Sequence, residues 1–427
     1  MKITIAPRAR IQGKPQIPGD KSISHRAQLF GALAEGVTTI TGLSGGGDVR
    51  STGKCLADLG VKIEAMKDGV TQIHGVGLRG FQAPKRPLDC GNSGSTMRIF
   101  MGFLAGQNFS SELVGDASLS QRPMARVADP LSRMGAKFEM TNGSFAPLWV
   151  RGQGRLEPMD YELKVASAQV KSAILLAALY AQGKTTIRGE IHSRDHTERL
   201  LPFFGVPVEV SADAITIEGG RALKANAISV PGDPSSAAFW LGAALVARES
   251  KVTIEKLLLN PTRIGAMNVL RRMGAELEMK TETEFPEPVG TVTIRRSALR
   301  GTMISADEVP SLIDELPLLA VLATYAEGVT EVRGAEELRV KETDRIDAVA
   351  ENLRRMGATV ETFPDGFRIK GPQPLRGAVL DSFHDHRIAM AFSIAGLGAT
   401  GVTEIENADS VEISYPTFFD TLDELSR

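Results

Sequence analysis

Charged, hydroxyl and amide side chains recur at six places in the chain, each at the start of a run of small apolar residues. The runs begin near Asp20, Asn92, Ser167, Asp233, Asp314 and Asp385. Each run has the composition of a buried helix, so these side chains fall at six helix N-termini. Such ends present free N–H groups and a positive dipole, which favour anions. The candidate anion-binding residues are Lys21, Ser22, Arg26, Asn92, Ser93, Arg98, Ser167, Gln169, Lys171, Ser235, Ser236, Asp314, Glu315, His386 and Arg387.

Further cations lie outside these six starts, at Arg122, Arg194, Lys341 and Arg345. Lys341 and Arg345 are four residues apart, so a continuous helix would place them on one face with Glu342 turned aside. An acid among cations stays ionised or exchanges a proton. A solvated surface network of ion pairs is the alternative for this stretch. The cations together predict binding of one or two small polyanions, and the arginines favour bidentate recognition of phosphate or carboxylate.

The six runs belong to a repeat of about 70 residues, which is the main evidence for the fold. A second recurring segment contains Met-Gly, Leu-Gly or Phe-Gly followed by alternating residues, as in LADLGVKIEA, LSRMGAKFEM, LPFFGVPVEV, LRRMGAELEM and LRRMGATVET. The glycine is typical of a left-handed helix terminus, and the alternation of a half-buried strand. Each repeat is therefore an α/β unit.

A longer period indicates two domains. Ile17–Asp20 and Val230–Asp233 read almost identically and lie 213 positions apart (230 − 17). We predict two similar three-unit domains, one of residues 20–232 and one of residues 1–19 plus 233–427, hinged by two chain crossings. Closure on a ligand would bring two faces of helix N-termini together as a cleft.

Composition excludes several classes of function. Charged residues make up 23% of the 427 residues and the net charge is −2, which favours neither nucleic acid nor an anionic membrane as partner. The first residues lack the apolar region of a signal peptide. Cys55 and Cys90 form no redox or metal motif, so we expect a reducing cytoplasm. His192 with His196, and His384 with His386, lack an evident third ligand, so we expect no metal.

Eight motifs resemble those of the 5-enolpyruvylshikimate-3-phosphate (EPSP) synthase family, in its second bacterial class. In chain order they are PGDKSISHR, GNSGSTMR, SQRPM, ASAQVKSA, VPGDPSSAAF, SLIDELP, RVKETDRI and DHRIAM. The resemblance runs from Ile17 to about Phe419. It implies an α/β (α+β) fold of two similar domains, each of three βαβαββ units in an inside-out α/β barrel.

The resemblance also implies an activity. The enolpyruvyl group of phosphoenolpyruvate would move to the 5-hydroxyl of shikimate 3-phosphate through a tetrahedral adduct, releasing phosphate in the shikimate pathway. We expect a monomer that uses no cofactor. Gly94 stands where a methyl group hinders the herbicide glyphosate in some members.

Site residues follow from the matched motifs. The catalytic residues would be Lys21, Asp314 and Glu342. Shikimate 3-phosphate would contact Lys21, Ser22, Arg26, Ser167, Ala168, Gln169, Arg194, Asp314 and Lys341. Phosphoenolpyruvate would contact Lys21, Gly94, Arg122, Gln169, Arg345 and Arg387.

Two alternatives stay open at this point. UDP-N-acetylglucosamine enolpyruvyl transferase would share the fold, but it carries a reactive cysteine in a loop that corresponds to residues 116–122, where this chain has none. A non-catalytic sugar-phosphate binder would need no acids within a polyanion site, so Asp314 and Glu342 argue against it.

Overall fold

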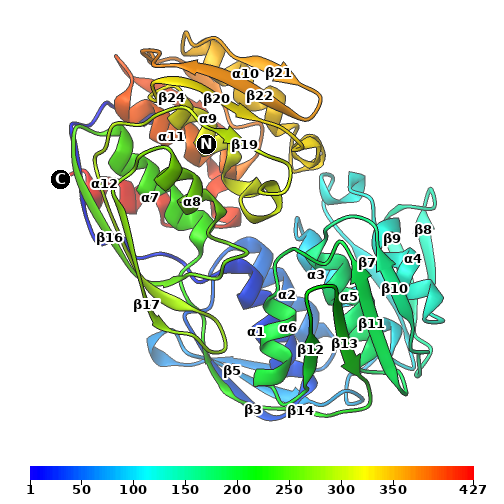
Figure 1. The fold of residues 1–427 in the computed structure, drawn as a ribbon. Coiled ribbons are helices and arrows are strands. Elements are labelled where there is room, and N and C mark those ends of the chain that lie inside the picture. The colour runs from blue at the N-terminus through cyan, green and yellow to red at the C-terminus, as the bar shows by residue number, and fades with distance from the viewer. The chain divides into compact units, whose positions relative to one another are not determined.

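The computed structural model describes residues 1–427, apart from the side chain of Asp68. The chain forms two compact units, one of Gly19–Val230 and one of Met1–Pro18 with Pro231–Arg427 (Figure 1). The chain therefore passes from one unit to the other twice.

Three helices form the centre of each unit and are buried on nearly every side. Every residue of α7 is buried, for example, because neighbouring elements surround it. Small residues let these helices approach closely: a Cβ on Gly102 would meet the Ala173 carbonyl oxygen at 2.3 Å. The central helices are α1 (Lys21–Leu33), α3 (Gly94–Ala105) and α5 (Ala168–Ala178) in one unit, and α7 (Pro234–Val246), α9 (Leu316–Ala323) and α11 (His386–Gly398) in the other.

A second set of helices alternates with the central ones along the chain. Five of them are followed by glycines whose φ angles are +88°, +93°, +89°, +96° and +89°, at Gly60, Gly135, Gly205, Gly274 and Gly357. The predicted left-handed helix termini are thus confirmed, because only glycine adopts this conformation without strain. The helices are α2 (Gly47–Asp58), α4 (Ala125–Arg133), α6 (His196–Phe203), α8 (Gly265–Arg272), α10 (Arg345–Arg355) and α12 (Phe418–Leu425).

The sheets of the first unit share one topology, in which a parallel pair of strands is extended by antiparallel strands. The first contains β14 (Leu223–Lys224), β15 (Ala227–Ser229), β3 (Ala34–Thr41), β5 (Thr71–Val76) and β4 (Lys62–Ala65). The others are β6 (Leu88–Asp89), β7 (Ser110–Val114), β9 (Phe145–Arg151) and β8 (Lys137–Thr141), then β10 (Asp160–Leu163), β11 (Lys184–Gly189), β13 (Ala214–Glu218) and β12 (Val208–Val210).

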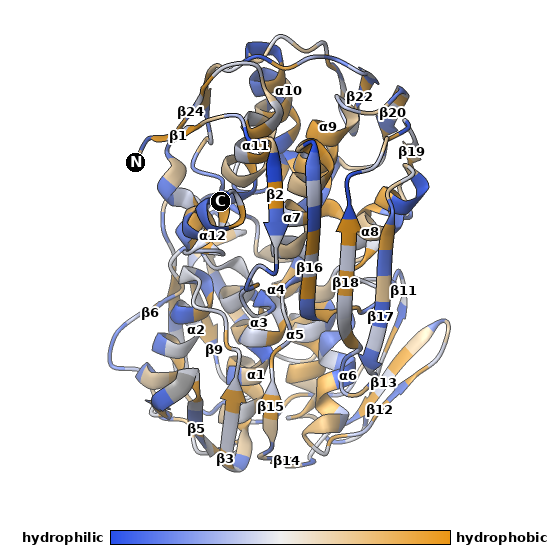
Figure 2. Cartoon of the chain, turned by 90° about the vertical axis from the view of Figure 1, so that its left-hand side faces the viewer, coloured by the Kyte–Doolittle hydropathy of each residue, from blue (hydrophilic) through white to orange (hydrophobic). Residues whose placement is uncertain are grey.

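The second unit repeats this topology with help from the N-terminal segment. Its first sheet orders β2 (Arg10–Gly13), β16 (Glu249–Leu258), β18 (Val289–Arg295) and β17 (Leu277–Thr283) side by side in front of α7 (Figure 2). The remaining sheets are β19 (Met303–Ile304), β20 (Gly328–Val332), β22 (Gly366–Gly371) and β21 (Glu361–Phe363), and β23 (Val379–Asp381), β24 (Thr403–Glu406) and β1 (Ile3–Ile5). The predicted fold of two similar three-unit domains is confirmed, with two N-terminal strands rather than one completing the second.

Short 3-10 helices occupy several connections between these elements. They are η1 (Lys67–Gly69), η2 (Leu119–Gln121), η3 (Val309–Ser311), η4 (Ile313–Glu315), η5 (Glu336–Val340) and η6 (Ala408–Ile413).

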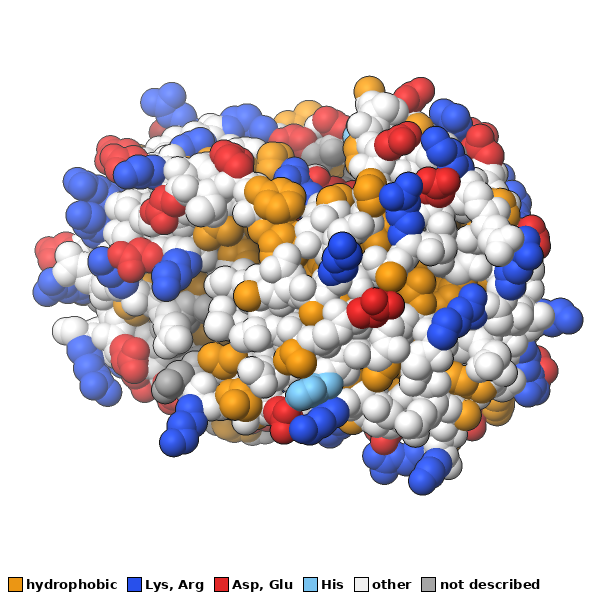
Figure 3. Space-filling view, turned by 90° about the horizontal axis from the view of Figure 1, so that it is seen from below, with side chains coloured by type: hydrophobic (Ala, Val, Ile, Leu, Met, Phe, Trp, Pro, Cys, Tyr) orange, Lys and Arg blue, Asp and Glu red, His pale blue; other side chains and the backbone are white. Residues whose placement is uncertain are grey.

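The surface mixes both signs of charge. On the face seen in Figure 3, acidic and basic side chains are interspersed, and among the side chains described there neither sign forms a continuous area. Within the described residues, no helix has the length and apolar character needed to span a bilayer.

A buried aromatic cluster ties the C-terminus to the rest of its unit. The Tyr415 hydroxyl donates to the Gln16 carbonyl oxygen at 2.8 Å and accepts from the Trp240 indole N–H at 3.0 Å. Phe418 stacks on Trp240 with ring centroids 5.0 Å apart. One hydroxyl thus joins the N-terminal segment, the central helix α7 and the residues before α12.

We predict that Tyr415→Phe lowers the stability of this unit by about 1–3 kcal/mol, because it leaves a buried indole N–H and a carbonyl without partners. The measurement is the midpoint of thermal unfolding, followed by circular dichroism. Tyr161→Phe, on a half-buried ring of β10, is the control and should shift the midpoint less. An unchanged midpoint for Tyr415→Phe would show that the bridge contributes nothing.

Candidate active site

Five of the six central helices begin with a polar side chain that caps the first turn; among the described residues α9 has no such cap, and it follows Asp314 and Glu315 in η4. Asp20 accepts from the Ile23 N–H, Ser93 from the Thr96 N–H and Ser167 from the Val170 N–H. Asp233 and Asp385 cap α7 and α11 in the same way. At α7 the cap leaves no spare N–H group in the first turn, because Pro234 has no N–H and Asp233 accepts from both Ser235 and Ser236.

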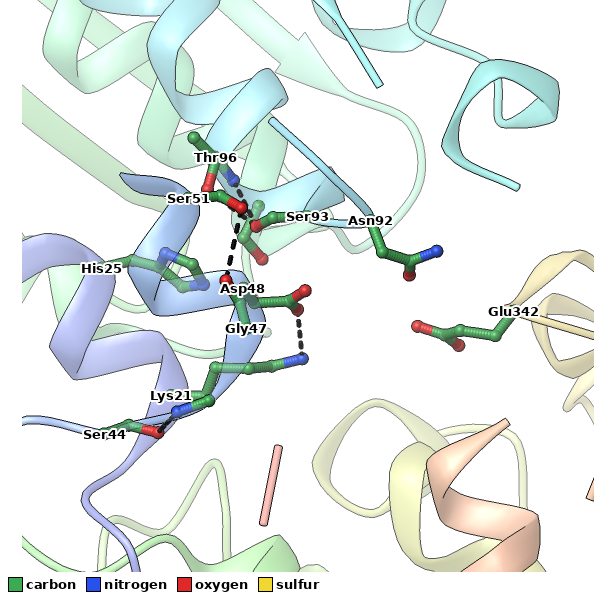
Figure 4. A network of polar contacts seen from close by, with 12 residues as sticks. Lys21, His25, Ser44, Gly47, Asp48, Ser51, Asn92, Ser93, Thr96 and Glu342 are labelled. Carbon is green, nitrogen blue, oxygen red and sulfur yellow. Dashed lines mark hydrogen bonds and ion pairs between the residues drawn. The ribbon is translucent and has the colours of Figure 1, made fainter. Parts of the chain in front are cut away.

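Lys21, in the first turn of α1, forms an ion pair with Asp48 that the sequence reasoning missed. The Lys21 ammonium lies 2.8 Å from the Asp48 carboxylate (Figure 4). Asp48 stands in the first turn of α2, directly after the glycines that precede that helix. An acid at a helix start after a glycine run is a signal that could have identified it.

A buried chain of polar groups joins the first helices of this unit. The His25 ring nitrogen Nδ1 lies 2.6 Å from the Thr52 hydroxyl, which lies 2.7 Å from that of Thr96. The Thr96 hydroxyl in turn donates to Ser93 at 2.7 Å. Burial, reinforced by Lys21 and Arg26, lowers the pKa of His25 well below its usual value. The His25 ring is therefore neutral at pH 7. Through these contacts it links α1 to α2 and α3.

Arg122 and Arg98 converge on the N-terminus of α3. Arg122 Nη2 donates to the Asn92 side-chain oxygen at 2.9 Å and to the Ser118 hydroxyl at 3.0 Å. A Cβ on Gly94 would meet Arg98 Nη1 at 3.1 Å and Arg122 Nη1 at 3.7 Å. Glycine at position 94 therefore leaves room beside two guanidinium groups.

The predicted shikimate 3-phosphate residues of this unit lie around α5 and α1. Gln169 accepts from Arg98 at 2.8 Å and donates to Ser95 at 3.2 Å. Arg26 is buried and donates to Thr197 and Ser172, both at 2.7 Å, and to the carbonyl of Ser22. Ser167 and Ala168 stand at the start of α5, and Arg194 lies in the segment before α6.

In the other unit, Arg345 brings three acids together. Its guanidinium lies 2.8 Å from Asp385, 2.8 Å from Glu342 and 3.2 Å from Asp314. Lys341 lies 3.7 Å from Asp314. Burial lowers the pKa of Arg345, but Asp385, Glu342 and Asp314 outweigh it and raise the pKa above its usual value. The Arg345 guanidinium is therefore permanently charged. Its partner Asp385 was expected from the sequence only as the start of a helix.

The prediction that Lys341 and Arg345 share one helix face is wrong. Helix α10 begins at Arg345, because the Asp344 carboxylate accepts from the N–H groups of Ile346 and Asp347 as an N-cap. Lys341 lies outside it, at the end of η5. The two cations meet through Asp314 instead.

Arg387 is the buried cation with open donors. Its side chain is 3% exposed and lies over the Phe239 ring at 5.9 Å, while Nε and Nη1 have no hydrogen-bond partner among the described residues. Nearby Glu315 is also buried. Burial and Asp314 raise the pKa of Glu315, while Arg387, Arg263 and the Ser235 hydroxyl oppose this. A guanidinium buried in this way is suited to an anionic ligand.

Arg263 is a further buried cation that sequence reasoning missed. Its Nη2 donates to the Asp233 carboxylate at 3.1 Å and to the Ser235 hydroxyl at 3.0 Å. It thereby holds the start of α7. No motif in the sequence distinguishes it from a surface arginine.

Lys171 differs from the other candidate cations. It is 1% exposed and pairs with Glu198 at 2.7 Å. Its ammonium is enclosed in the unit and does not present a free end at the helix N-terminus.

Comparison with known proteins agrees with this geometry. The model of the family described as EPSP synthase (3-phosphoshikimate 1-carboxyvinyltransferase) matches residues 5–422. A 3-phosphoshikimate 1-carboxyvinyltransferase of Desulforamulus reducens is 48% identical over 427 residues, covering 100% of this chain and 99% of the relative. The Chloroflexus aurantiacus protein of the same name is 50% identical over 426 residues, with 98% of each chain covered.

Solved structures show the same fold. EPSP synthase from Acinetobacter baumannii superposes with a TM-score of 0.89 at 42% identity, covering 99% of this chain and 98% of that one. The enolpyruvyl transferase NikO from Streptomyces tendae superposes with a TM-score of 0.80 at 19% identity, covering 99% and 96%, and supports the fold alone. With a family match across nearly its whole length and relatives close to half identical, the chain belongs to the EPSP synthase family.

Proposed function

We propose that this chain transfers the enolpyruvyl group of phosphoenolpyruvate to the 5-hydroxyl of shikimate 3-phosphate and releases inorganic phosphate. The observation that carries the proposal is the family match over residues 5–422. The reaction is a step of the shikimate pathway, toward chorismate and the aromatic amino acids. Both substrates are small polyanions, which suit capped helix N-termini surrounded by arginine and lysine.

Phosphoenolpyruvate would be bound mainly by arginines. Arg387 supports this assignment, since its open Nε and Nη1 could each donate a charge-assisted hydrogen bond to an anionic ligand. Gly94 supports it as well, because the missing side chain leaves space beside Arg122. The full set is Lys21, Gly94, Arg122, Gln169, Arg345 and Arg387.

Shikimate 3-phosphate would be bound by hydroxyl, amide and cationic groups. Ser167 and Ala168 support this, because they begin α5 and offer the N–H groups of a helix N-terminus. The full set is Lys21, Ser22, Arg26, Ser167, Ala168, Gln169, Arg194, Asp314 and Lys341.

The chemistry needs one general base and two further proton transfers. Asp314 would accept the proton of the 5-hydroxyl as its oxygen attacks C2 of phosphoenolpyruvate. A proton added to the methylene carbon completes the tetrahedral adduct, and its loss from the methyl group accompanies cleavage of the C–O bond to phosphate. Glu342 and Lys21 would carry these two transfers. The surrounding cations would stabilise charge on the adduct and on the departing phosphate.

No step of this reaction requires a metal or an organic cofactor. We propose that the protein is cytoplasmic, as its two cysteines without a redox or metal motif favour, and that it acts as a monomer. Neither nucleic acid nor a membrane enters the reaction.

Phosphate release tests the function directly. We expect release only with phosphoenolpyruvate and shikimate 3-phosphate together, unaffected by a chelator. Release with UDP-N-acetylglucosamine instead would mean that the acceptor is wrong. No release with either acceptor would favour a non-catalytic sugar-phosphate binder.

We predict that Arg122→Lys raises the KM for phosphoenolpyruvate by roughly 10- to 100-fold, because a single ammonium cannot replace a bidentate charge-assisted contact. Steady-state kinetics at saturating shikimate 3-phosphate measure this. Arg133→Lys, on the exposed end of α4, is the control. Unchanged kinetics for Arg122→Lys would remove Arg122 from the site.

We predict that Glu342→Gln lowers kcat by roughly 100-fold or more, as expected when a proton-transfer group is lost, while both substrates still bind. Glu351→Gln, on the exposed face of α10, is the matched control and should leave kcat unchanged. Turnover of Glu342→Gln within about threefold of the unaltered enzyme would exclude Glu342 from proton transfer.

A further inference from the structure

A buried ion pair contacts the segment that carries Arg194. Lys171, in the first turns of α5, and Glu198, in the first turn of α6, meet at 2.7 Å with side chains 1% and 4% exposed. Burying two charges is costly, and a pair of apolar side chains of similar volume is often at least as stable. The residues around Lys171 in α5 are almost all apolar, so the charge calls for a reason beyond packing.

The other contacts of Lys171 indicate that reason. Its ammonium also donates to the main-chain carbonyls of Ile191 at 2.8 Å and Ser193 at 3.3 Å. Two of the three donors of the ammonium thus go to main-chain carbonyls, and the Glu198 carboxylate balances its charge from 2.7 Å. The carbonyls belong to residues 190–195, between the end of β11 and the start of α6. One side chain therefore fixes this connection at two points of its backbone.

The start of α6 is fixed from a second direction. Thr197, next to Glu198, accepts from Arg26 of α1 at 2.7 Å and lies 2.7 Å from the Ser172 hydroxyl of α5. Arg26 also donates to Ser172 at 2.7 Å. Helices α1 and α5 thus both hold the first turn of α6, and all these residues lie in the Gly19–Val230 unit.

We propose that Lys171 and Glu198 are positioning residues for shikimate 3-phosphate. The Lys171 ammonium holds the backbone of residues 190–195 so that Arg194 meets the sugar phosphate. Glu198 neutralises the charge of that ammonium. Neither residue touches the substrate. This proposal rests on the proposed function, which assigns Arg194 to shikimate 3-phosphate.

The decisive variant is the double substitution Lys171→Met with Glu198→Leu. It removes both charges at nearly constant volume, so its melting temperature should fall less than that of Lys171→Met alone, which leaves a buried charge unpaired. The carbonyls of Ile191 and Ser193 lose their donor, however, and the segment loosens. We expect the dissociation constant and KM for shikimate 3-phosphate to rise roughly tenfold or more, since small misplacements of binding groups have effects of this size. The KM for phosphoenolpyruvate should change less than threefold.

Single variants and a control complete the experiment. Lys171→Met alone leaves Glu198 buried without its counter-charge, so it should lower the melting temperature as well as weaken shikimate 3-phosphate binding. Arg188→Met is the control, because it removes an exposed cation that lies 3.3 Å from Asp160 in the same unit. It should change neither the melting temperature nor the binding of shikimate 3-phosphate.

Calorimetric titration of shikimate 3-phosphate separates the possible failures. A double variant that binds it as tightly as the unaltered enzyme would overturn the positioning role and leave a merely structural pair. Equal increases in the KM of both substrates would overturn it too. If the unaltered enzyme neither binds shikimate 3-phosphate nor releases phosphate, the proposed function itself fails.

Discussion

The near-complete burial of the central helices is the constraint on which the rest of the structure depends. A helix enclosed by other elements has no exposed face for charged groups, so its polar residues gather where the helix begins. There the first N–H groups need acceptors, which the side chains of Asp20, Ser93 and Ser167 supply. The packing that makes a helix apolar along its length thus produces a polar, anion-binding end. Repetition of one α/β unit places such a polar end at the start of each central helix, although α9 has no side-chain cap within the described residues.

Closure of the repeats depends on segments that are distant in the sequence. Strands β14 and β15, at the end of the Gly19–Val230 unit, pair with β3 near its beginning. In the other unit, β2 pairs with β16 and β1 with β24, so the N-terminal segment completes two sheets. Paired in this way, strands at the ends of a unit leave fewer unpaired edges. The Tyr415 hydroxyl adds a contact between the two terminal parts of the chain.

The buried cations differ in the partners that surround them, and these differences bear on function. Arg345 is surrounded by Asp385, Glu342 and Asp314, which keep it charged and hold it in place. Arg387 keeps two donor atoms open among the described residues and so can accept an anionic ligand. The Lys171 ammonium donates to two main-chain carbonyls and pairs with Glu198, so it holds other groups in place. Donors left open suit a buried cation to an anionic ligand, and donors that are engaged hold neighbouring groups in place.

Local pattern sufficed for the repeats, the alternation of helices and strands, the left-handed glycines and the helix starts that hold Lys21, Ser167 and Arg387. These depend on short-range chemistry: capping, the conformational freedom of glycine and apolar periodicity are all written within a few residues. Tertiary structure alone decided that Asp48 pairs with Lys21, and that Lys171 is enclosed while Arg387 is open. These outcomes depend on partners tens of residues away, whose distances and burial no local pattern encodes.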